Sequence, residues 1–336
     1  MKTIKISGVG VHSGKKSVME ITPTKSGGIV FVRDGVRIPA RFDNVGNAML
    51  RNTTIGTAPN EVQTIEHLMA ALFVSGVADC EIKIDNSETP ILDGSAAELI
   101  KLLKPIAEKS RAPYLVIKKP VIARQSESMK KMPVLLRFLS KTAGFFKGRK
   151  LDGWVGLSPV RGRKLEVAAR LIYKERIIGD QSFGFVFDYD DFAKSAADFA
   201  KNIARSRTFG KAGEWEWLKA HGMGRGVDET NVIALGTIGD LERLHKIGIG
   251  KGIKKSALKA RGENEVVALN GLFYPDEFVR HKIIDAVGDL YTSGFRIVGK
   301  LESYKGSHAM NNIVLRKLFA DPENYDIISE NKRIRE

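Results

Sequence analysis

In the first third of the chain, apolar residues recur at helical spacing in some segments and alternate with polar residues in others. These patterns predict helices and strands. Residues 62–76 carry apolar side chains at helical spacing and predict a helix that Thr64 caps and Gly76 ends. A second helix is expected over residues 95–108. Alternating apolar and polar residues predict strands at 4–11, 17–21 and 78–85. We therefore expect a sheet with helices on one face, an α+β arrangement.

The same plan returns after residues 110–113, a stretch typical of a linker that ends in Pro113. No sequence repeat accompanies this second set of patterns. The order predicts two domains, residues 1–112 and 113–336, both of the α+β class. The second contains strand patterns at 114–117, 154–159, 164–172 and 183–187 and helical patterns at 190–203 and 276–292.

Two basic segments, near residues 129–150 and 236–263, interrupt the second domain and look like insertions. The first holds seven Lys and Arg residues and no acid, with its apolar residues on one helical face. Such a helix can lie on anionic lipid, and a basic connection docked on the second domain explains the pattern equally well. The glycine-punctuated residues 245–261 predict a solvated loop.

Composition narrows the class of protein. The net charge of +15 favours anionic partners, which include nucleic acid, acidic lipid and phosphorylated substrates. Nucleic acid is not expected, because residues 245–261 lack the aromatic side chains on which bases stack. One cysteine, Cys80, excludes an internal disulfide. Without a signal peptide or a membrane-length apolar run, we expect a cytoplasmic protein, with peripheral contact at the inner face of the membrane.

Two fragments about 200 residues apart supply the donors of a metal site. Glu66 and His67 are adjacent, while His281 and Asp285 are one helical turn apart on one face. Together they offer two imidazoles, one carboxylate and a spare glutamate beside a ligand. That set is typical of a catalytic zinc site with one position left for water. A third fragment places His308 among small and polar residues.

These fragments belong to a larger set of motifs. The chain resembles the zinc-dependent UDP-3-O-acyl-N-acetylglucosamine deacetylases of lipid A synthesis. The resemblance keeps the family's order across nearly the whole chain. It is carried by residues 8–16, 64–72, 90–96, 206–210, 280–289 and 306–312.

The resemblance implies a fold and a cofactor. The fold would be two similar domains, each a mainly antiparallel sheet layered with helices, with the active site between them. One Zn²⁺ per chain would be held by His67, His281 and Asp285. Glu66 would be the general base. The substrate would be an acylated UDP-amino sugar.

The resemblance also implies five further roles. Thr208 would stabilise the oxyanion, and His308 would be the general acid. Asp289 would orient His308 and favour its charged form. His12 and Lys282 would bind the substrate, including its anionic part.

These residue types suit hydrolysis of an amide. Zinc acidifies water and polarises a carbonyl, and a neighbouring carboxylate such as Glu66 can take the proton from that water. A hydroxyl donor such as that of Thr208 suits the oxyanion. The departing amine needs a proton, which an imidazolium can give. Phe209, beside Thr208, is either a core residue or a substrate contact.

Three readings of the function stay open. Trp215, Arg225 and Asp228 are bulkier or more charged than an apolar acyl passage favours, because an unpaired charge there is costly. The protein could therefore deacetylate another N-acyl sugar or a shorter-acyl substrate. The basic charge also fits a non-catalytic homologue that binds nucleic acid or membrane. The leading hypothesis remains zinc-dependent release of acetate from the acylated UDP-sugar.

Overall fold

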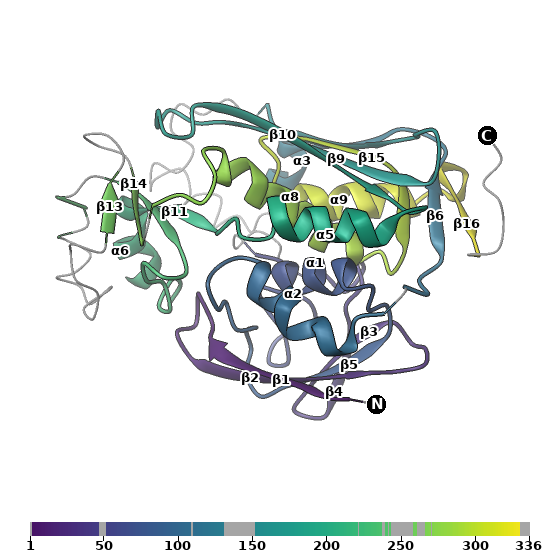
Figure 1. Cartoon of the computed structure of the whole chain (residues 1–336), viewed down its shortest axis with the longest axis horizontal. Helices are drawn as coiled ribbons and strands as arrows, with labels where there is room; N and C mark the ends of the chain where they lie inside the picture. The colour runs from purple at the N-terminus through teal and green to yellow at the C-terminus, as the bar shows by residue number, and fades with distance from the viewer. Residues whose placement is uncertain are drawn as a thin grey trace.

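The computed structural model describes residues 2–46, 52–108, 110–130, 152–220, 222–236, 239–240, 242, 258–260, 266–269 and 271–329. Within these residues the chain forms two large sheets with helices layered between them, and a smaller third sheet at one end (Figure 1). The expected amphipathic helix of residues 129–150 lies outside the described residues apart from its first two positions.

The first sheet uses only the first 84 residues. Its strands stand in the order β1-β2-β5-β3-β4, and every neighbouring pair is antiparallel except β3 and β5. Alternation in β1 and β2 buries Ile6 opposite Met19, so one face carries the core. The strands are β1 (Ile4–Val9), β2 (Lys16–Pro23), β3 (Ile29–Arg33), β4 (Val36–Pro39) and β5 (Cys80–Ile84).

Helices α1 (Glu66–Val74) and α2 (Ala97–Leu103) follow the predicted positions but are shorter than predicted. Every residue of α1 is buried. The predicted capping role of Thr64 is wrong, because this residue has a positive φ of 60° and Ile65 is the N-cap. The Thr64 hydroxyl instead donates to Glu88 at 2.9 Å. The 3-10 turn Lys104–Ile106 continues α2.

The second sheet begins at residue 114. Its strands run in the order β10-β9-β15-β6-β16, with β8 also pairing with β15 and β7 with β8. β15 is parallel to β9 and β6, whereas the other pairs are antiparallel. The strands are β6 (Tyr114–Ile117), β7 (Val121–Arg124), β8 (Trp154–Ser158), β9 (Lys164–Ile172), β10 (Asp180–Asp188), β15 (Arg296–Tyr304) and β16 (Tyr325–Ile328).

The helices of this second part include one that the apolar pattern did not lead us to predict, α9 (His308–Phe319). Helix α8 (Glu277–Tyr291) lies against α1 and against β9 and β10, in the layer between the two large sheets (Figure 1). The remaining elements are α3 (Gln125–Lys130), α5 (Phe192–Asn202) and the 3-10 turn Pro322–Asn324.

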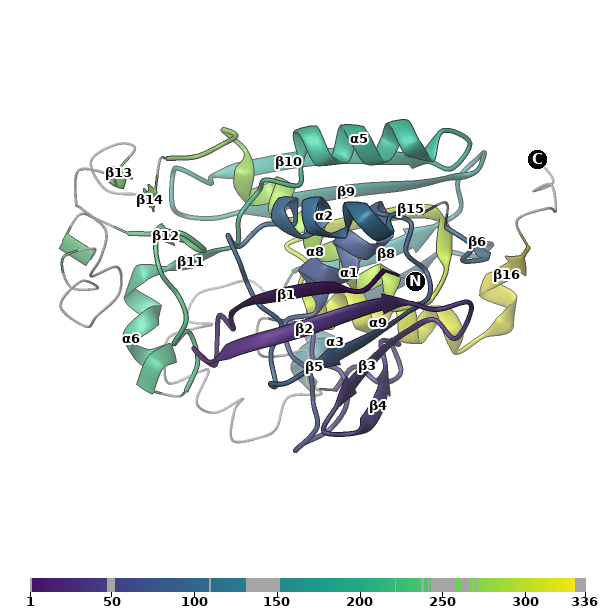
Figure 2. The same cartoon turned by 60° about the horizontal axis from the view of Figure 1, so that its bottom comes forward.

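The third sheet stands beside the layered body (Figure 2). Its order is β11-β12-β14-β13, and α6 (Ala212–Ala220) packs against β11. Strand β13 falls within residues 245–261, so the predicted solvated loop is wrong for that part. The strands are β11 (Phe209–Lys211), β12 (Ile233–Leu235), β13 (Leu258–Ala260) and β14 (Val266–Leu269).

The fold is α+β, with two sheets of mainly antiparallel strands layered with helices, as predicted. The proposed domain boundary at residues 112 and 113 falls between the 3-10 turn and β6 and stays a prediction. Among the described residues, no helix combines the length and the apolar character needed to cross a bilayer.

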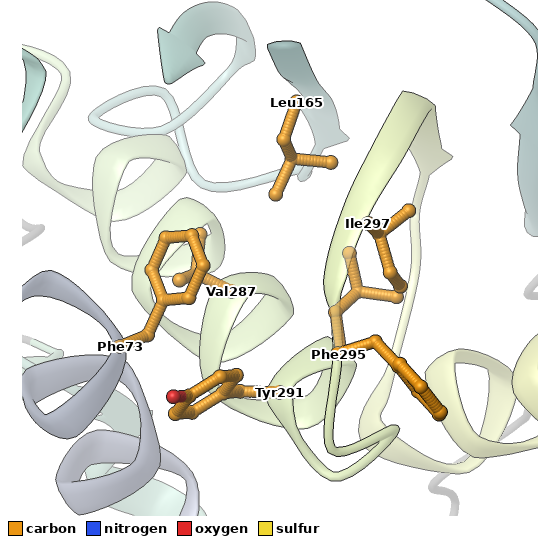
Figure 3. Close-up of a pocket in the computed structure, with 7 residues that line it drawn as sticks. Phe73, Leu165, Val287, Tyr291, Phe295 and Ile297 are labelled. Carbon is orange, nitrogen blue, oxygen red and sulfur yellow. The ribbon is translucent and has the colours of Figure 1, made fainter. Parts of the chain in front are cut away.

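A small apolar cavity of about 10 Å³ lies where α1 and α8 meet the second sheet (Figure 3). This volume is at the lower limit for one water molecule, and the lining is mainly apolar. We therefore treat it as a packing void within the core. It is lined by Phe73, Leu165, Val287, Leu290, Tyr291, Phe295 and Ile297.

Phe73 joins α1 to the second sheet and its helices. Its ring meets Phe187, Phe192 and Tyr291 edge-on, with centroids 5.0, 5.5 and 5.2 Å away. We expect Phe73→Ala to lower the free energy of unfolding by about 3–5 kcal/mol, because it removes these contacts and enlarges the void. Urea unfolding checks this value. Val186→Ala, at an exposed position of β10, is the control with an expected change within about 0.5 kcal/mol.

Candidate metal centre and active site

The site forms where the start of α1 lies against the middle of α8. Glu66 and His67 occupy the first turn of α1, while His281 and Asp285 lie one turn apart on α8. The two helices are in close contact at Gly288, where a Cβ atom would overlap the Glu66 carbonyl oxygen and stand 2.7 Å from its carbon. A glycine at this position therefore allows the two halves of the site to meet.

His67, His281 and Asp285 turn their donor atoms toward one point. These atoms all lie within 4.8 Å of one another, and all three residues are buried. Asp285 Oδ1 is 3.3 Å from His281 Nε2 and 3.5 Å from His67 Nε2. Two ligand atoms bonded to one tetrahedral zinc ion at about 2.0–2.1 Å stand about 3.4 Å apart. Both distances from Asp285 Oδ1 therefore fit a metal of this size and geometry.

The Asp285 carboxylate gives a second indication of a cation. Within the described part of the chain, its buried Oδ1 accepts no hydrogen bond, although two imidazole nitrogens face it. Burial alone would raise the pKa of Asp285, but His281, Lys282 and His308 hold it well below its usual value. A buried carboxylate oxygen without a donor is costly, and a metal ion would satisfy it.

Hydrogen bonds from neighbouring residues orient two members of this group. His281 Nδ1 lies 3.0 Å from the Ser206 carbonyl oxygen, which can only accept, so Nδ1 carries the proton and Nε2 is left to bind a metal. Lys282 Nζ donates to Asp285 Oδ2 at 2.6 Å. Burial lowers the pKa of His67, although Asp285 acts in the opposite direction. The lowered pKa favours the neutral imidazole, which is the form that binds a metal.

Glu66 lies beside this group and is buried. Its Oε2 accepts a hydrogen bond from the Thr53 backbone N–H at 2.9 Å. Burial raises the pKa of the Glu66 carboxyl to about 7, with a further increase from Asp289 and Asp285 and an opposing effect of His308. A carboxyl in this range can exchange protons near neutral pH.

His308 begins α9 and faces the same group. Its Nδ1 donates to Asp289 Oδ2 at 2.8 Å, and its Nε2 lies 3.9 Å from Asp285 Oδ2. Burial alone would lower the pKa of His308, but Asp289, Glu66 and Asp285 raise it to about 9. Asp289 is held in place by Asn311 Nδ2 at 2.8 Å and by the Thr53 hydroxyl. The predicted pair of His308 and Asp289 is thus in contact.

Thr208 directly precedes β11, and Phe209 is the first residue of that strand. The Thr208 backbone is fixed on both sides, because its N–H donates to Gly94 O and its carbonyl accepts from Ile233 N, each at 2.8 Å. The Phe209 ring is partly buried, with its centroid 5.1 Å from that of Phe278 and 6.3 Å from that of His281. Phe209 therefore both packs on α8 and borders the metal-ligand candidates.

His12 lies in a loop that is tied to the start of α1 through Glu88. The fully buried Glu88 carboxylate accepts from the backbone N–H groups of His12 and Ser13, at 2.9 and 2.7 Å. It also accepts from Thr64, two residues before Glu66. A Cβ on Gly10 would lie 2.8 Å from Glu88 Cδ, so a larger residue there would displace the carboxylate that holds this loop.

Three residues were bulkier or more charged than an apolar acyl passage favours, and they lie in different environments. Trp215 is buried and packs with Val11 and Ile91 in a small separate core. Arg225 is exposed, while its backbone N–H donates to His12 O at 3.1 Å. Asp228 Oδ1 accepts from the backbone N–H groups of Thr230 and Asn231.

Some residues of the site were not given roles from the sequence. Thr53, Ser206, Glu88 and Asn311 each hold a candidate site residue through a hydrogen bond. Only Asn311 carried a local signal, since it lies three residues after His308 on the same helical face. The other three act from loops, where sequence spacing does not predict contacts.

The chain is similar to known proteins over most of its length. The family model of UDP-3-O-acyl N-acetylglycosamine deacetylase matches residues 1–145, 137–239 and 234–320. A UDP-3-O-acyl-N-acetylglucosamine deacetylase of Myxococcus xanthus (strain DK1622) is 32% identical over 99% of this chain and 89% of its own length. A protein of the same name from Shewanella baltica (strain OS155 / ATCC BAA-1091) is 31% identical over 98% of this chain and 92% of its own length.

These matches extend over nearly the full length of the chain, so they include both large sheets and all six motif regions. A third relative, from Shewanella sp. (strain ANA-3), is 31% identical over the same share of the chain. The chain belongs to the UDP-3-O-acyl N-acetylglycosamine deacetylase family.

Proposed function

We propose that this protein is a zinc-dependent deacetylase in lipid A biosynthesis. It removes the N-acetyl group of a UDP-3-O-acyl-N-acetylglucosamine-type substrate and releases acetate. The observation that carries the proposal is the buried group of His67, His281 and Asp285 with Glu66 beside it. The names of the relatives, which act on this kind of substrate, support the same reaction.

His67, His281 and Asp285 would hold one Zn²⁺. Two imidazoles and one carboxylate suit zinc, although iron(II) or cobalt accept the same donors. When bound, the ion would acidify the attacking water and polarise the amide carbonyl. The Ser206 carbonyl keeps His281 in the tautomer that presents Nε2 to this ion.

Three residues of the chain handle protons and charge in this reaction. Glu66 takes a proton from the attacking water, and Thr53 N–H fixes the carboxylate that does so. The Thr208 hydroxyl donates to the oxyanion that forms on the carbonyl carbon. His308 gives a proton to the departing amine, and Asp289 keeps its Nε2 facing the site.

Three further residues would bind the substrate. The Lys282 side chain is 22% exposed and its Nζ is paired with Asp285, so a cation that is partly open to solvent lies beside the metal-ligand group. We assign Lys282 and His12 to the anionic part of the UDP-sugar. Phe209 offers a partly buried ring face beside His281, with Lys282 Nζ 6.0 Å from its centroid.

Removal of the metal tests this function directly. Protein treated with a chelator should release no acetate from UDP-3-O-acyl-N-acetylglucosamine, and added zinc should restore the activity. Zinc at 1,000 times its Kd should also stabilise the chelated protein by about 4 kcal/mol, which thermal unfolding measures without substrate. Acetate release that survives complete metal removal would contradict the zinc mechanism.

A substrate panel separates the remaining alternatives. Metal analysis of the protein as purified, combined with acetate release from UDP-sugars of different acyl length, distinguishes the leading substrate from a shorter-acyl or different N-acyl sugar. No acetate from any of them would favour a binding protein. The cytoplasmic location and the peripheral contact with anionic membrane stay predictions from the sequence.

A further inference from the structure

Arg207 and Glu277 form a buried ion pair next to the metal centre. Their side chains are 4% and 0% exposed. Glu277 Oε1 accepts from Arg207 Nε at 2.9 Å and from the Arg207 backbone N–H at 3.0 Å. Its Oε2 accepts from Phe273 N–H at 2.7 Å and from Arg207 Nη2 at 3.3 Å. Each carboxylate oxygen therefore has two donors, and Arg207 Nη2 also reaches Gly271 O at 2.6 Å.

This pair connects two segments that both carry site residues. Glu277 lies in the first turn of α8, one turn before His281. Arg207 directly follows Ser206, whose carbonyl accepts from His281 Nδ1, and directly precedes Thr208. Residues four apart on a helix share one face, so the ion pair and the Ser206–His281 hydrogen bond attach the same face of α8 at two points.

Stability alone does not account well for such a pair. Burying two charges loses much of their hydration, which offsets their attraction, so a buried ion pair is weak evidence of net stabilisation. The guanidinium and the carboxylate instead fix an orientation, because each donor must match a fixed acceptor. They fix the orientation of the Ser206–Thr208 backbone relative to α8.

We propose that Arg207 and Glu277 are positioning residues of the metal centre. They hold the Ser206 carbonyl against His281 Nδ1 and so keep His281 Nε2 aimed at the metal. They also fix the position of Thr208 along the axis of α8. The proposal rests on the proposed function, because it takes His281 as a metal ligand.

Zinc affinity provides the test. Arg207→Lys keeps the charge but loses the fork, and Glu277→Asp keeps the carboxylate but withdraws it by one methylene. We expect each variant to bind zinc about 10–100-fold more weakly than the unaltered protein, as loss of a group that orients a ligand does in other metal sites. Competition with a chromophoric chelator measures the Kd without substrate or turnover.

Arg296→Lys is the matched control. Arg296 is also a buried arginine at 4% exposure, and its Nε donates to Ala112 O at 2.7 Å at the start of β15. This variant should lose stability while its zinc Kd stays unchanged. If Arg207→Lys and Glu277→Asp lower Tm as Arg296→Lys does and leave the zinc Kd unchanged, the pair is only structural and the proposal is wrong.

The tautomer of His281 gives a second measurement that needs no variant of the pair. Long-range proton–nitrogen NMR of the metal-free protein should show the proton on Nδ1, with the signal assigned by its loss in His281→Gln. A proton on Nε2 would overturn the proposal. Both measurements omit substrate, so a failure to release acetate would end the proposed function and leave this inference to be judged by zinc affinity and tautomer.

Discussion

Gly288→Ala should disable the metal centre and destabilise the protein, although the same change stabilises most helices. In an exposed helix interior, alanine is favoured over glycine by about 1 kcal/mol. Here a Cβ would overlap the Glu66 carbonyl oxygen and lie 3.1 Å from Ala70 N. These are backbone atoms of α1, so no side-chain rotation relieves the overlap. The helices must separate, which carries Glu66 and His67 away from His281 and Asp285.

We expect the free energy of unfolding to fall by about 1–3 kcal/mol, the usual effect of an overpacked contact. Zinc affinity and acetate release should fall together, because both depend on the spacing of α1 and α8. Chelator competition and urea unfolding measure the two effects on the same sample. Gly213→Ala is the matched control: it lies in α6, and a Cβ there would meet nothing within 4 Å. That variant should be neutral or slightly more stable, and a Gly288→Ala protein that matches it would contradict the argument.

The sequence predicted best what depends on local periodicity. Helix α8 was predicted over residues 276–292 and spans Glu277–Tyr291, because its apolar residues recur at helical spacing over four turns. The shared face of His281 and Asp285 follows from that helix alone. Helix α9 had similar local signals, with Ser307 as its N-cap and Met310, Val314 and Leu318 buried on one face. These local signals are sufficient to predict α9 from the sequence.

Contacts between distant segments were predictable only from the chemistry of their side chains and from the resemblance. No spacing rule places His67 beside His281, because their approach depends on the packing of α1 on α8. The ordered motifs implied in advance that His67 and His281 bind one metal. They also contain Gly288, which had no predicted role and whose steric role the structure explains. The family comparisons confirm the resemblance itself, while the role of each residue stays a prediction until it is measured.

Hydrogen bonds from irregular segments were beyond sequence reasoning. Thr53 donates through its backbone to Glu66 and through its hydroxyl to Asp289, yet it lies in a segment without regular structure. Thr64 was predicted as a helix cap because of its residue type, and a positive φ turns it toward Glu88 instead. In both cases a carboxylate that is distant in the sequence determines which hydrogen bonds the threonine makes. Local propensity carries no information on the position of that carboxylate.

Glu66→Gln should lower kcat by about 10²–10⁴-fold, the usual contribution of a general base, while zinc still binds. The substitution is nearly isosteric, and the amide oxygen can still accept from Thr53 N–H. An amide cannot take up the proton of the attacking water, so the loss should fall on kcat with little change in KM. Acetate release under saturating zinc measures kcat and KM, and chelator competition measures the retained metal.

Glu98→Gln is the control, because Glu98 is an exposed glutamate in the first turn of α2 and should tolerate the same change. Two results for Glu66→Gln would have different meanings. Lost activity with lost zinc would make Glu66 a determinant of metal binding and would leave its role as a base unsupported. Full activity with zinc retained would exclude Glu66 as the base. This buried carboxylate would then need another explanation, because burying it without a chemical role is unfavourable.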